Sequence, residues 1–273
     1  MTFIASLKTK NGILQVSDSL ELETGAISRY DDFRKLLNSK GIEEDNEEFK
    51  LTAKEIWETF KPERIKNKDG AKKTFKIFEY GSIQVAGSVI ISGIEVSDII
   101  QQLIKIITPK LPLTHLQIAE ELMQILKPHF PDRESGAFDN PASESIASTD
   151  FIYSHYEPKT NEKFVHKLCY SQNHFTKNFT FIDQFEGREE WIYYPSGMVG
   201  LAYNFSSLNS SSIIFGELNF VNGFQILKHA VELSILTEKI NYDIPGVGGT
   251  INFSIIDKHG FRFIKDINDL FED

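Results

Sequence analysis

The pattern of apolar and polar residues begins with two short runs that have the character of β-strands. Phe3–Leu7 and Ile13–Val16 flank the triplet Lys-Asn-Gly at positions 10–12. Asn-Gly between two apolar runs is a strong hairpin signal, because both residues tolerate the positive φ angles of a tight turn. The sequence therefore predicts a β-hairpin centred near residue 11.

Further strands are predicted wherever β-branched and aromatic residues gather between turn signals. Tyr80 and Gly81 mark one turn, with expected strands over Thr74–Glu79 and Ser82–Ala86. The region from 151 to 215 is β-rich, and its candidate strands are Phe151–Tyr156, Phe164–Tyr170, Phe179–Ile182, Trp191–Tyr194 and Leu201–Phe205. Two last strands are expected over Thr250–Ile256 and Phe261–Ile264.

Two segments with helical spacing follow the second strand pair. The first covers residues 97–107, with Ser97 or Asp98 as the expected N-cap. The second covers residues 114–127, where Thr114 and Gln117 have the spacing of a capping box and the apolar residues form one stripe. Two consecutive helices after two strand pairs favour a layered fold in which helices pack on sheets.

The longest helical pattern, over residues 223–240, lies just before the last strands, and Asn222 is its expected N-cap. A shorter helix is expected over residues 51–60, because Thr52 and Glu55 have capping-box spacing and Pro62 would end it. The order of elements predicts one α+β domain over residues 1–273, built as a four-layer αββα sandwich. Residues 128–150, rich in Pro, Ser, Gly and Asp, are expected to form a loop or an insertion.

Composition and charge exclude several classes of function. The formal net charge of −10 disfavours a general role on nucleic acid or on an anionic membrane. Cys169 is the single cysteine, so an intramolecular disulfide and a Cys₄ zinc site are excluded. No apolar run is long enough to cross a bilayer, and the first residues lack a signal-peptide pattern. We therefore expect a cytoplasmic protein with no membrane or nucleic-acid partner.

Three blocks of the sequence resemble mature proteasome β-type subunits. The first, Thr2–Ser19, contains a threonine, a strand, a glycine turn, a second strand and then Asp-Ser. The second, Lys72–Gly87, contains a Lys-Lys pair, a strand, a turn and a strand that ends in Gly. The third, Gly248–Gly260, is similar to the closing hairpin of that fold. The resemblance implies an N-terminal nucleophile (Ntn) hydrolase, with insertions at about 20–70 and 128–195.

The resemblance implies a threonine peptidase that hydrolyses peptide bonds through an acyl-enzyme. Removal of Met1 would leave Thr2 with both a hydroxyl and a free α-amine. An α-amine has a reference pKa of about 7.7–8.0, so part of it is neutral and can accept the hydroxyl proton. The candidate catalytic residues are Thr2, Asp18, Lys73, Gly87 and Ser210.

Each of the other four candidates matches one position of the family. Lys73 matches the active-site lysine, and Asp18 matches the acidic residue that orients it. The backbone N–H of Gly87 matches the oxyanion hole, where a glycine permits close approach of substrate. Ser210 is the nearest match to the serine that precedes the third helix of the family.

The resemblance also implies partners and a mode of assembly. The expected substrate is a peptide or an unfolded protein, and no cofactor is expected. The chain is expected to self-assemble into rings or helical stacks, with an ATP-dependent unfoldase as a candidate partner. We expect no propeptide before the threonine, because the sequence starts with Met-Thr, and we therefore expect the greatest similarity to the bacterial proteasome-like subunits.

Two other functions fit the same residues. The chain could be a non-catalytic assembly or scaffold protein that keeps the sandwich and retains Met1. Four departures from the family pattern favour this alternative. Leu20 stands where an Arg often follows Asp-Ser, and Val247 stands in the place of a Ser. Asp243 lies one residue too far back to match the family's Asp, and Ser210 lacks the flanking glycines. The third possibility is an amidohydrolase that acts on a small amide with the same nucleophile.

Other chemistries have weaker support in the sequence. His166, His174 and Asp183 could surround a metal ion, but histidines scattered at this spacing are expected to be structural. The loop 246–249 is too short for a phosphate loop and has no following Lys-Ser or Lys-Thr. Cys169 lies in an apolar strand and is expected to be a buried structural thiol.

Overall fold

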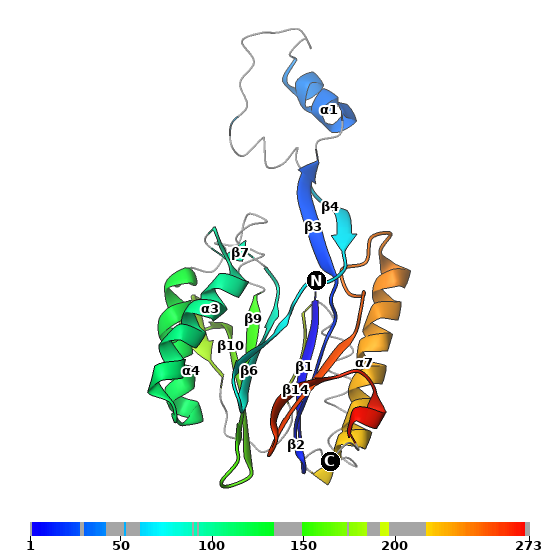
Figure 1. The fold of residues 1–273 in the computed structure, drawn as a ribbon. Helices are drawn as coiled ribbons and strands as arrows, with labels where there is room; N and C mark the ends of the chain where they lie inside the picture. The colour runs from blue at the N-terminus through cyan, green and yellow to red at the C-terminus, as the bar shows by residue number, and fades with distance from the viewer. Residues whose placement is uncertain are drawn as a thin grey trace.

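The fold is mixed α+β, with antiparallel sheets and helices that pack against them (Figure 1). It is seen in a computed structural model that describes residues 2–27, 30–41, 52, 61–88, 90–91, 93–133, 149–173, 175–184, 192–196 and 217–270. Two five-stranded sheets form its body. We name them the β1 sheet and the β6 sheet.

The β1 sheet contains the first and the last strand of the described chain. Its strand order is β12-β1-β2-β13-β14, and every neighbouring pair is antiparallel. The predicted hairpin is confirmed: β1 and β2 pair from Ile4↔Ser17 to Thr9↔Gly12. The strands are β1 Thr2–Thr9, β2 Gly12–Ser17, β12 Ile192–Ser196, β13 Asn252–Asp257 and β14 Gly260–Ile264.

The β6 sheet has the strand order β11-β10-β9-β6-β5, again with antiparallel pairs throughout. Its strands are β5 Thr74–Phe78, β6 Gly81–Ala86, β9 Asp150–Glu157, β10 Glu162–Gln172 and β11 Phe179–Asp183. Each lies on a predicted strand to within two residues at either end. Three of these strands fall inside the second region that the sequence marks as an insertion.

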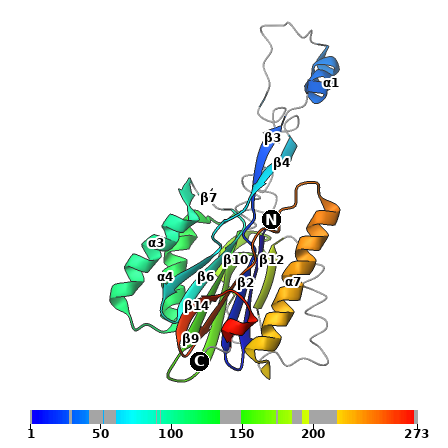
Figure 2. The same cartoon turned by 45° about the vertical axis from the view of Figure 1, so that its right-hand side comes forward.

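The helices lie on the outer sides of the two sheets, as both views show (Figures 1 and 2). α3, Val96–Ile107, and α4, His115–Leu126, pack on the β6 sheet, whereas α7, Phe220–Asn241, packs on the β1 sheet. The predicted capping box of α4 is confirmed, because Thr114 and Gln117 bond each other's backbone N–H. Short 3₁₀ helices are formed by Thr108–Lys110, Lys127–His129 and Ile267–Leu270.

The apolar core consists of three separate clusters. One fills the space between α3, α4 and the β6 sheet, and includes Ile83, Leu103 and Phe151. A second joins α7 to the β1 sheet through side chains such as Phe3 and Leu227. The third lies between the two sheets, and its buried residues are Ile4, Ile13, Ala86, Ile152, Tyr156, Val165, Ile256 and Phe261. The sheets therefore face each other across a core of their own.

Polar side chains share the space between the sheets with this third cluster. The fully buried amide of Gln15 accepts hydrogen bonds from Ser82 and Ser254 at 2.7 and 3.2 Å. It donates hydrogen bonds to Ser6 and Ser154 at 3.0 and 3.1 Å. The four bonds use both donors and both lone pairs of the amide, so burial leaves none of them unsatisfied.

A two-stranded arm projects from the body (Figures 1 and 2). It consists of β3, Glu21–Ile27, and β4, Lys61–Lys68, paired from Glu21↔Lys68 to Ile27↔Lys61. α1, Tyr30–Lys40, follows β3 at the far end. The arm lies in the first expected insertion, but its two strands and α1 were not predicted. A smaller pair, β7 Ile90–Ile91 and β8 Ile94–Glu95, precedes α3.

Two predicted helix starts were wrong. α7 begins at Phe220 with Asn219 as its N-cap, because the Asn219 side chain accepts a bond from the N–H of Asn222. α3 begins at Val96, with Glu95 at the N-cap position, and no side chain caps it.

Two other predicted elements, the helix over 51–60 and the strand over 201–205, lie outside the described residues, since Thr52 is the one described residue in these two ranges. Among the described helices, none combines the length and the apolar character needed to span a membrane.

We expect the Gln15→Ala substitution to lower the free energy of unfolding by about 3 kcal/mol, because it leaves four buried hydroxyls without their shared partner. The matched control is Gln101→Ala, at an exposed position of α3, which should change stability by less than about 0.5 kcal/mol. Urea unfolding of the three proteins measures both values. Equal stability of the two variants would contradict a structural role for Gln15.

Candidate functional site

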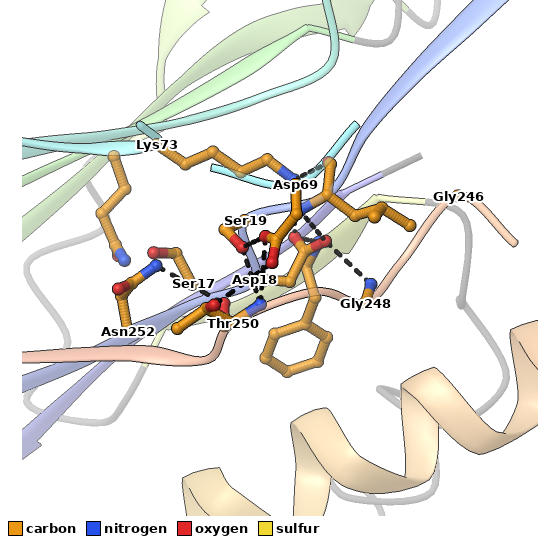
Figure 3. Close-up of polar contacts among 12 residues, drawn as sticks. Ser17, Asp18, Ser19, Asp69, Lys73, Gly246, Gly248, Thr250 and Asn252 are labelled. Carbon is orange, nitrogen blue, oxygen red and sulfur yellow. Dashed lines mark hydrogen bonds and ion pairs between the residues drawn. The ribbon is translucent and has the colours of Figure 1, made fainter. Parts of the chain in front are cut away.

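The carboxylate of Asp18, directly after β2, is the centre of the candidate site (Figure 3). It is fully buried and accepts four hydrogen bonds. Oδ1 accepts from the Phe3 amide and from the Lys73 ammonium, each at 2.8 Å. Oδ2 accepts from the amides of Gly248 at 3.0 Å and Leu20 at 3.3 Å. Donors to both oxygens stabilise the ionised carboxylate in a place that excludes water.

Lys73 reaches Asp18 from the other sheet. It precedes β5, and its Nζ also donates to the carbonyl oxygen of Leu20 at 2.5 Å. Its side chain is only 7% exposed, and this burial lowers the pKa of Lys73 from its usual value, although the charge of Asp18 opposes the shift. A lysine held in this way keeps a fixed position and releases a proton more readily than a surface lysine.

Thr2 is the first described residue, and the geometry of β1 places it beside this ion pair. Successive side chains of a strand point to opposite faces. Phe3 packs toward α7, whereas Ile4 and Ser6 face the β6 sheet, so Thr2 faces the β6 sheet with them. The amide nitrogen bonded to Asp18 is that of Phe3, which follows Thr2 directly. Thr2 is therefore one peptide unit from the Asp18 carboxylate, on the side from which Lys73 approaches.

Gly87 lies at the same end of the β6 sheet as Lys73. The Val85 amide, two residues before Gly87, donates to the Lys73 carbonyl oxygen at 2.9 Å. Gly87 has a φ of 107°, a positive backbone angle that residues with a side chain rarely adopt. Of the five predicted site residues, Asp18 and Lys73 are in direct contact, and Thr2 and Gly87 lie in backbone segments that are hydrogen-bonded to them through Phe3 and Val85. The fifth, Ser210, lies outside the described residues, and so does Met1.

A second cluster, Ser19, Asp69 and Thr250, adjoins the first and was not predicted (Figure 3). Asp69 accepts a hydrogen bond from the Ser19 hydroxyl through Oδ1 and one from the Thr250 hydroxyl, at 3.3 Å, through Oδ2. The Thr250 amide donates to Ser19 Oγ at 2.7 Å. The bonds from Ser19, Thr250 and Gly70 lower the pKa of Asp69. This cluster joins Asp69, at the base of the arm, to Ser19, which follows Asp18, and to Thr250, which precedes β13.

The glycine pair at 248–249 is the sequence signal that points to this cluster. Gly249 has a φ of 72°, and a Cβ atom there would overlap the Asp69 carboxylate. Gly248 contributes its N–H to Asp18 and its carbonyl oxygen to the amides of Ser19 and Leu20. Gly249 therefore permits the close approach of Asp69 and Ser19, whereas Gly248 acts through its backbone N–H and carbonyl groups. Asp69 itself had no recognisable motif, because it lies at the end of an insertion.

Two further residues before this pair have structural roles. Val247, where the resemblance to proteasome β-type subunits would place a serine, is buried in the core between α7 and the β1 sheet. The buried carboxylate of Glu238 accepts a hydrogen bond from the Gly246 amide at 2.9 Å. α7 thus fixes the loop that carries Gly248 to Asp18.

The histidines form a separate cluster under the N-terminus of α4. His166 Nδ1 lies 2.7 Å from Asp183 Oδ2, and His166 Nε2 lies 3.0 Å from His115 Nδ1. His155 Nδ1 lies 2.8 Å from the Tyr153 hydroxyl. The third residue of the predicted trio, His174, is outside the described residues. Within the described part of the chain, no group of three or more His, Cys, Asp or Glu is arranged to hold a metal ion.

Cys169 is buried, as predicted, and burial raises the pKa of its thiol to about 12. A thiol with such a pKa is protonated at neutral pH and is a poor nucleophile.

Comparison of the sequence with models of known protein families gives no match, and a search of curated proteins gives none either. The geometry of the site therefore carries the functional argument.

The histidine cluster predicts a loss of stability in mild acid. Burial, with the neighbouring His115 and His166, lowers the pKa of His155 from 6.5 to about 4. The folded state therefore binds fewer protons than the unfolded state between these values, so stability is full above pH 6.5 and falls toward pH 4. Wild type therefore loses free energy of unfolding as the pH falls from 7 to 4, and we expect this loss to be about 3 kcal/mol smaller in the His155→Gln variant.

The measurement is urea unfolding at several pH values between 4 and 7. The control is His229→Gln, since His229 is 70% exposed on α7 and should leave the pH profile unchanged. Identical pH profiles for wild type and His155→Gln would show that His155 is not the group responsible.

Proposed function

We propose that the chain is a threonine-type N-terminal nucleophile peptidase, which hydrolyses peptide bonds through an acyl-enzyme on Thr2. One observation carries the proposal. A single Asp18 oxygen accepts hydrogen bonds from both the Lys73 ammonium and the amide of Phe3, the residue bonded to Thr2. A buried lysine fixed beside a threonine in the first strand is what such a nucleophile requires.

The proposed reaction begins at the N-terminus that removal of Met1 would create. The Thr2 hydroxyl attacks the peptide carbonyl carbon, and its proton passes to the α-amine, directly or through a water. The nearby Lys73 ammonium lowers the pKa of that amine, which keeps more of it neutral. The amine then gives the proton to the leaving nitrogen, and a water molecule hydrolyses the ester on Thr2.

Asp18 and Gly87 support the charge that develops. Asp18 is a positioning residue, because it holds the Lys73 ammonium from its buried site without contact with substrate. The N–H of Gly87 stabilises the oxyanion of the tetrahedral intermediate. A donor fixed before the reaction needs no reorganisation in the transition state, which is why such groups contribute strongly to rate.

The order of layers supports the same assignment. Helices α3 and α4, the β6 sheet, the β1 sheet and α7 follow one another, as in a four-layer αββα sandwich of the Ntn type. We propose one such domain over residues 1–273, with the arm as an insertion. The proposal includes peptides or unfolded proteins as substrates, no cofactor, a cytoplasmic location and self-assembly into rings or helical stacks. An ATP-dependent unfoldase is a candidate partner.

A non-catalytic assembly protein is the second candidate, and Val247 is the observation that favours it. The side chain is buried in the core at the position where the family has a serine near the nucleophile. A chain that retained Met1 would keep the Asp18–Lys73 ion pair as a structural element. The two candidates differ in one property, which is the presence of a free amine on Thr2.

Thr2→Ala should abolish peptide hydrolysis and leave assembly unchanged, because it removes the hydroxyl that forms the acyl-enzyme. The measurement is cleavage of a mixture of fluorogenic peptides by the purified full chain. The control is Thr2→Ser, which keeps a hydroxyl and should keep measurable activity. Undiminished activity of Thr2→Ala would exclude Thr2 as the nucleophile.

Lys73→Ala should lower kcat/KM by about 100-fold or more, because it removes the fixed charge beside the amine and the nucleophile. Lys72→Ala is the matched control, since Lys72 is the exposed neighbour and should leave activity unchanged. Circular dichroism of both variants verifies the fold. A folded Lys73→Ala variant with full activity would contradict the assigned role.

Intact mass before and after incubation with a peptide epoxyketone separates the two candidate functions. This reagent needs both the amine and the hydroxyl of an N-terminal threonine. Loss of Met1 and one adduct on Thr2 are expected for the peptidase. A retained Met1 with no adduct would overturn the peptidase proposal in favour of the assembly protein.

A further inference from the structure

The outer face of α7 carries an exposed apolar stripe. Leu233, Leu236 and Ile240 are 39%, 54% and 73% exposed, respectively. The opposite face of the helix packs on the β1 sheet through residues such as Leu227 and Val231. Both views show α7 at the edge of the molecule, with the sheet on its inner side (Figures 1 and 2). Clustered apolar side chains on an outer helix face mark an interaction surface.

The spacing of the stripe fits another helix. Leu233, Leu236 and Ile240 follow the i, i+3, i+7 pattern of positions a, d and a in a heptad. His229, seven residues before Leu236, takes the preceding d position and is 70% exposed. A seam of this width, about two side chains across, accepts the knobs of one partner helix.

The flanking charges identify the partner as a second copy of the same helix. Glu232 and Lys239 are both exposed and occupy successive g positions beside the stripe. In an antiparallel helix pair, g positions face g positions, so Glu232 of one copy lies opposite Lys239 of the other copy. The two-fold axis repeats this pair, so the contact contains two pairs of opposite charge. In a parallel pair, g faces e, and the e positions are Ala230 and Thr237, which carry no charge. The pattern is self-complementary in the antiparallel arrangement alone.

We propose that α7 binds α7 of a second copy of this chain, antiparallel and around a two-fold axis. Leu233 then opposes Leu236 of the partner subunit, and Ile240 opposes His229 of the partner subunit. Glu232 also lies 4.0 Å from Lys228 and 3.5 Å from His229 on its own helix. Those pairs are exposed and weak, so they do not prevent the new contact. The proposal does not depend on peptidase activity.

The first test is molar mass by sedimentation equilibrium of the full chain over a range of concentrations. We expect the wild type to form dimers or a larger assembly, and Leu236→Glu to reduce the mass to half or less. The matched control is Leu116→Glu on α4, because Leu116 is 56% exposed and lies on the opposite side of the molecule. This control should keep the wild-type mass. A monomeric wild type, or an unchanged mass for Leu236→Glu, would overturn the proposal.

The second test reverses the charges. Glu232→Lys places like charges together at both ends of the seam and should raise the dissociation constant of this contact about ten-fold. Adding Lys239→Glu to it restores two opposite pairs with their signs exchanged, so the double variant should regain wild-type affinity. A partner helix of different sequence, or a parallel arrangement, would not give this restoration. Failure of the double variant to recover would therefore reject the antiparallel pair, even if Leu236→Glu weakens association.

Discussion

The burial of the Asp18 carboxylate is the constraint on which the site depends. A carboxylate inside a protein is tolerated only when donors replace its water, and here each donor comes from a different part of the chain. β1 supplies the Phe3 amide, the start of the arm supplies Leu20, the segment before β5 supplies Lys73, and the loop after α7 supplies Gly248. One side chain thus fixes the positions of β1, the segment before β5 and the loop after α7, which are far apart in sequence.

Local patterns in the sequence predicted many of the strands and helices. The hairpin at Asn11 and the capping box at Thr114 follow from turn and cap chemistry that acts over a few residues, so both were predictable. The pairing of Asp18 with Lys73 was expected only through the resemblance to a family. Nothing local at either residue indicates that their side chains meet across two sheets.

The parts that escaped prediction have a common physical reason. Asp69 acquires its role because the arm returns to the point where it started, and strand pairing between distant segments leaves no periodic signal nearby. Gly248 was predicted to lie in a loop, but its bond to Asp18 depends on the packing of α7. The predicted N-cap of α7 was three residues too late, because Asn219 and Asn222 are both good N-cap residues. Which of them is used depends on where the backbone changes from extended to helical, and this change occurs after Asn219.

The hydrogen-bonded amide of Gln15 has a consequence for how the two sheets are aligned. An apolar interface between sheets tolerates small sliding movements, since dispersion contacts have little directional preference. Hydrogen bonds have preferred directions, and those of Gln15 tie strands of both sheets to one another. The sheets are therefore held in a single alignment. Lys73 directly precedes a strand of the β6 sheet, whereas Thr2 lies in the β1 sheet. The distance between Lys73 and Thr2 therefore depends on the hydrogen bonds of Gln15, which lie between the sheets and away from both residues.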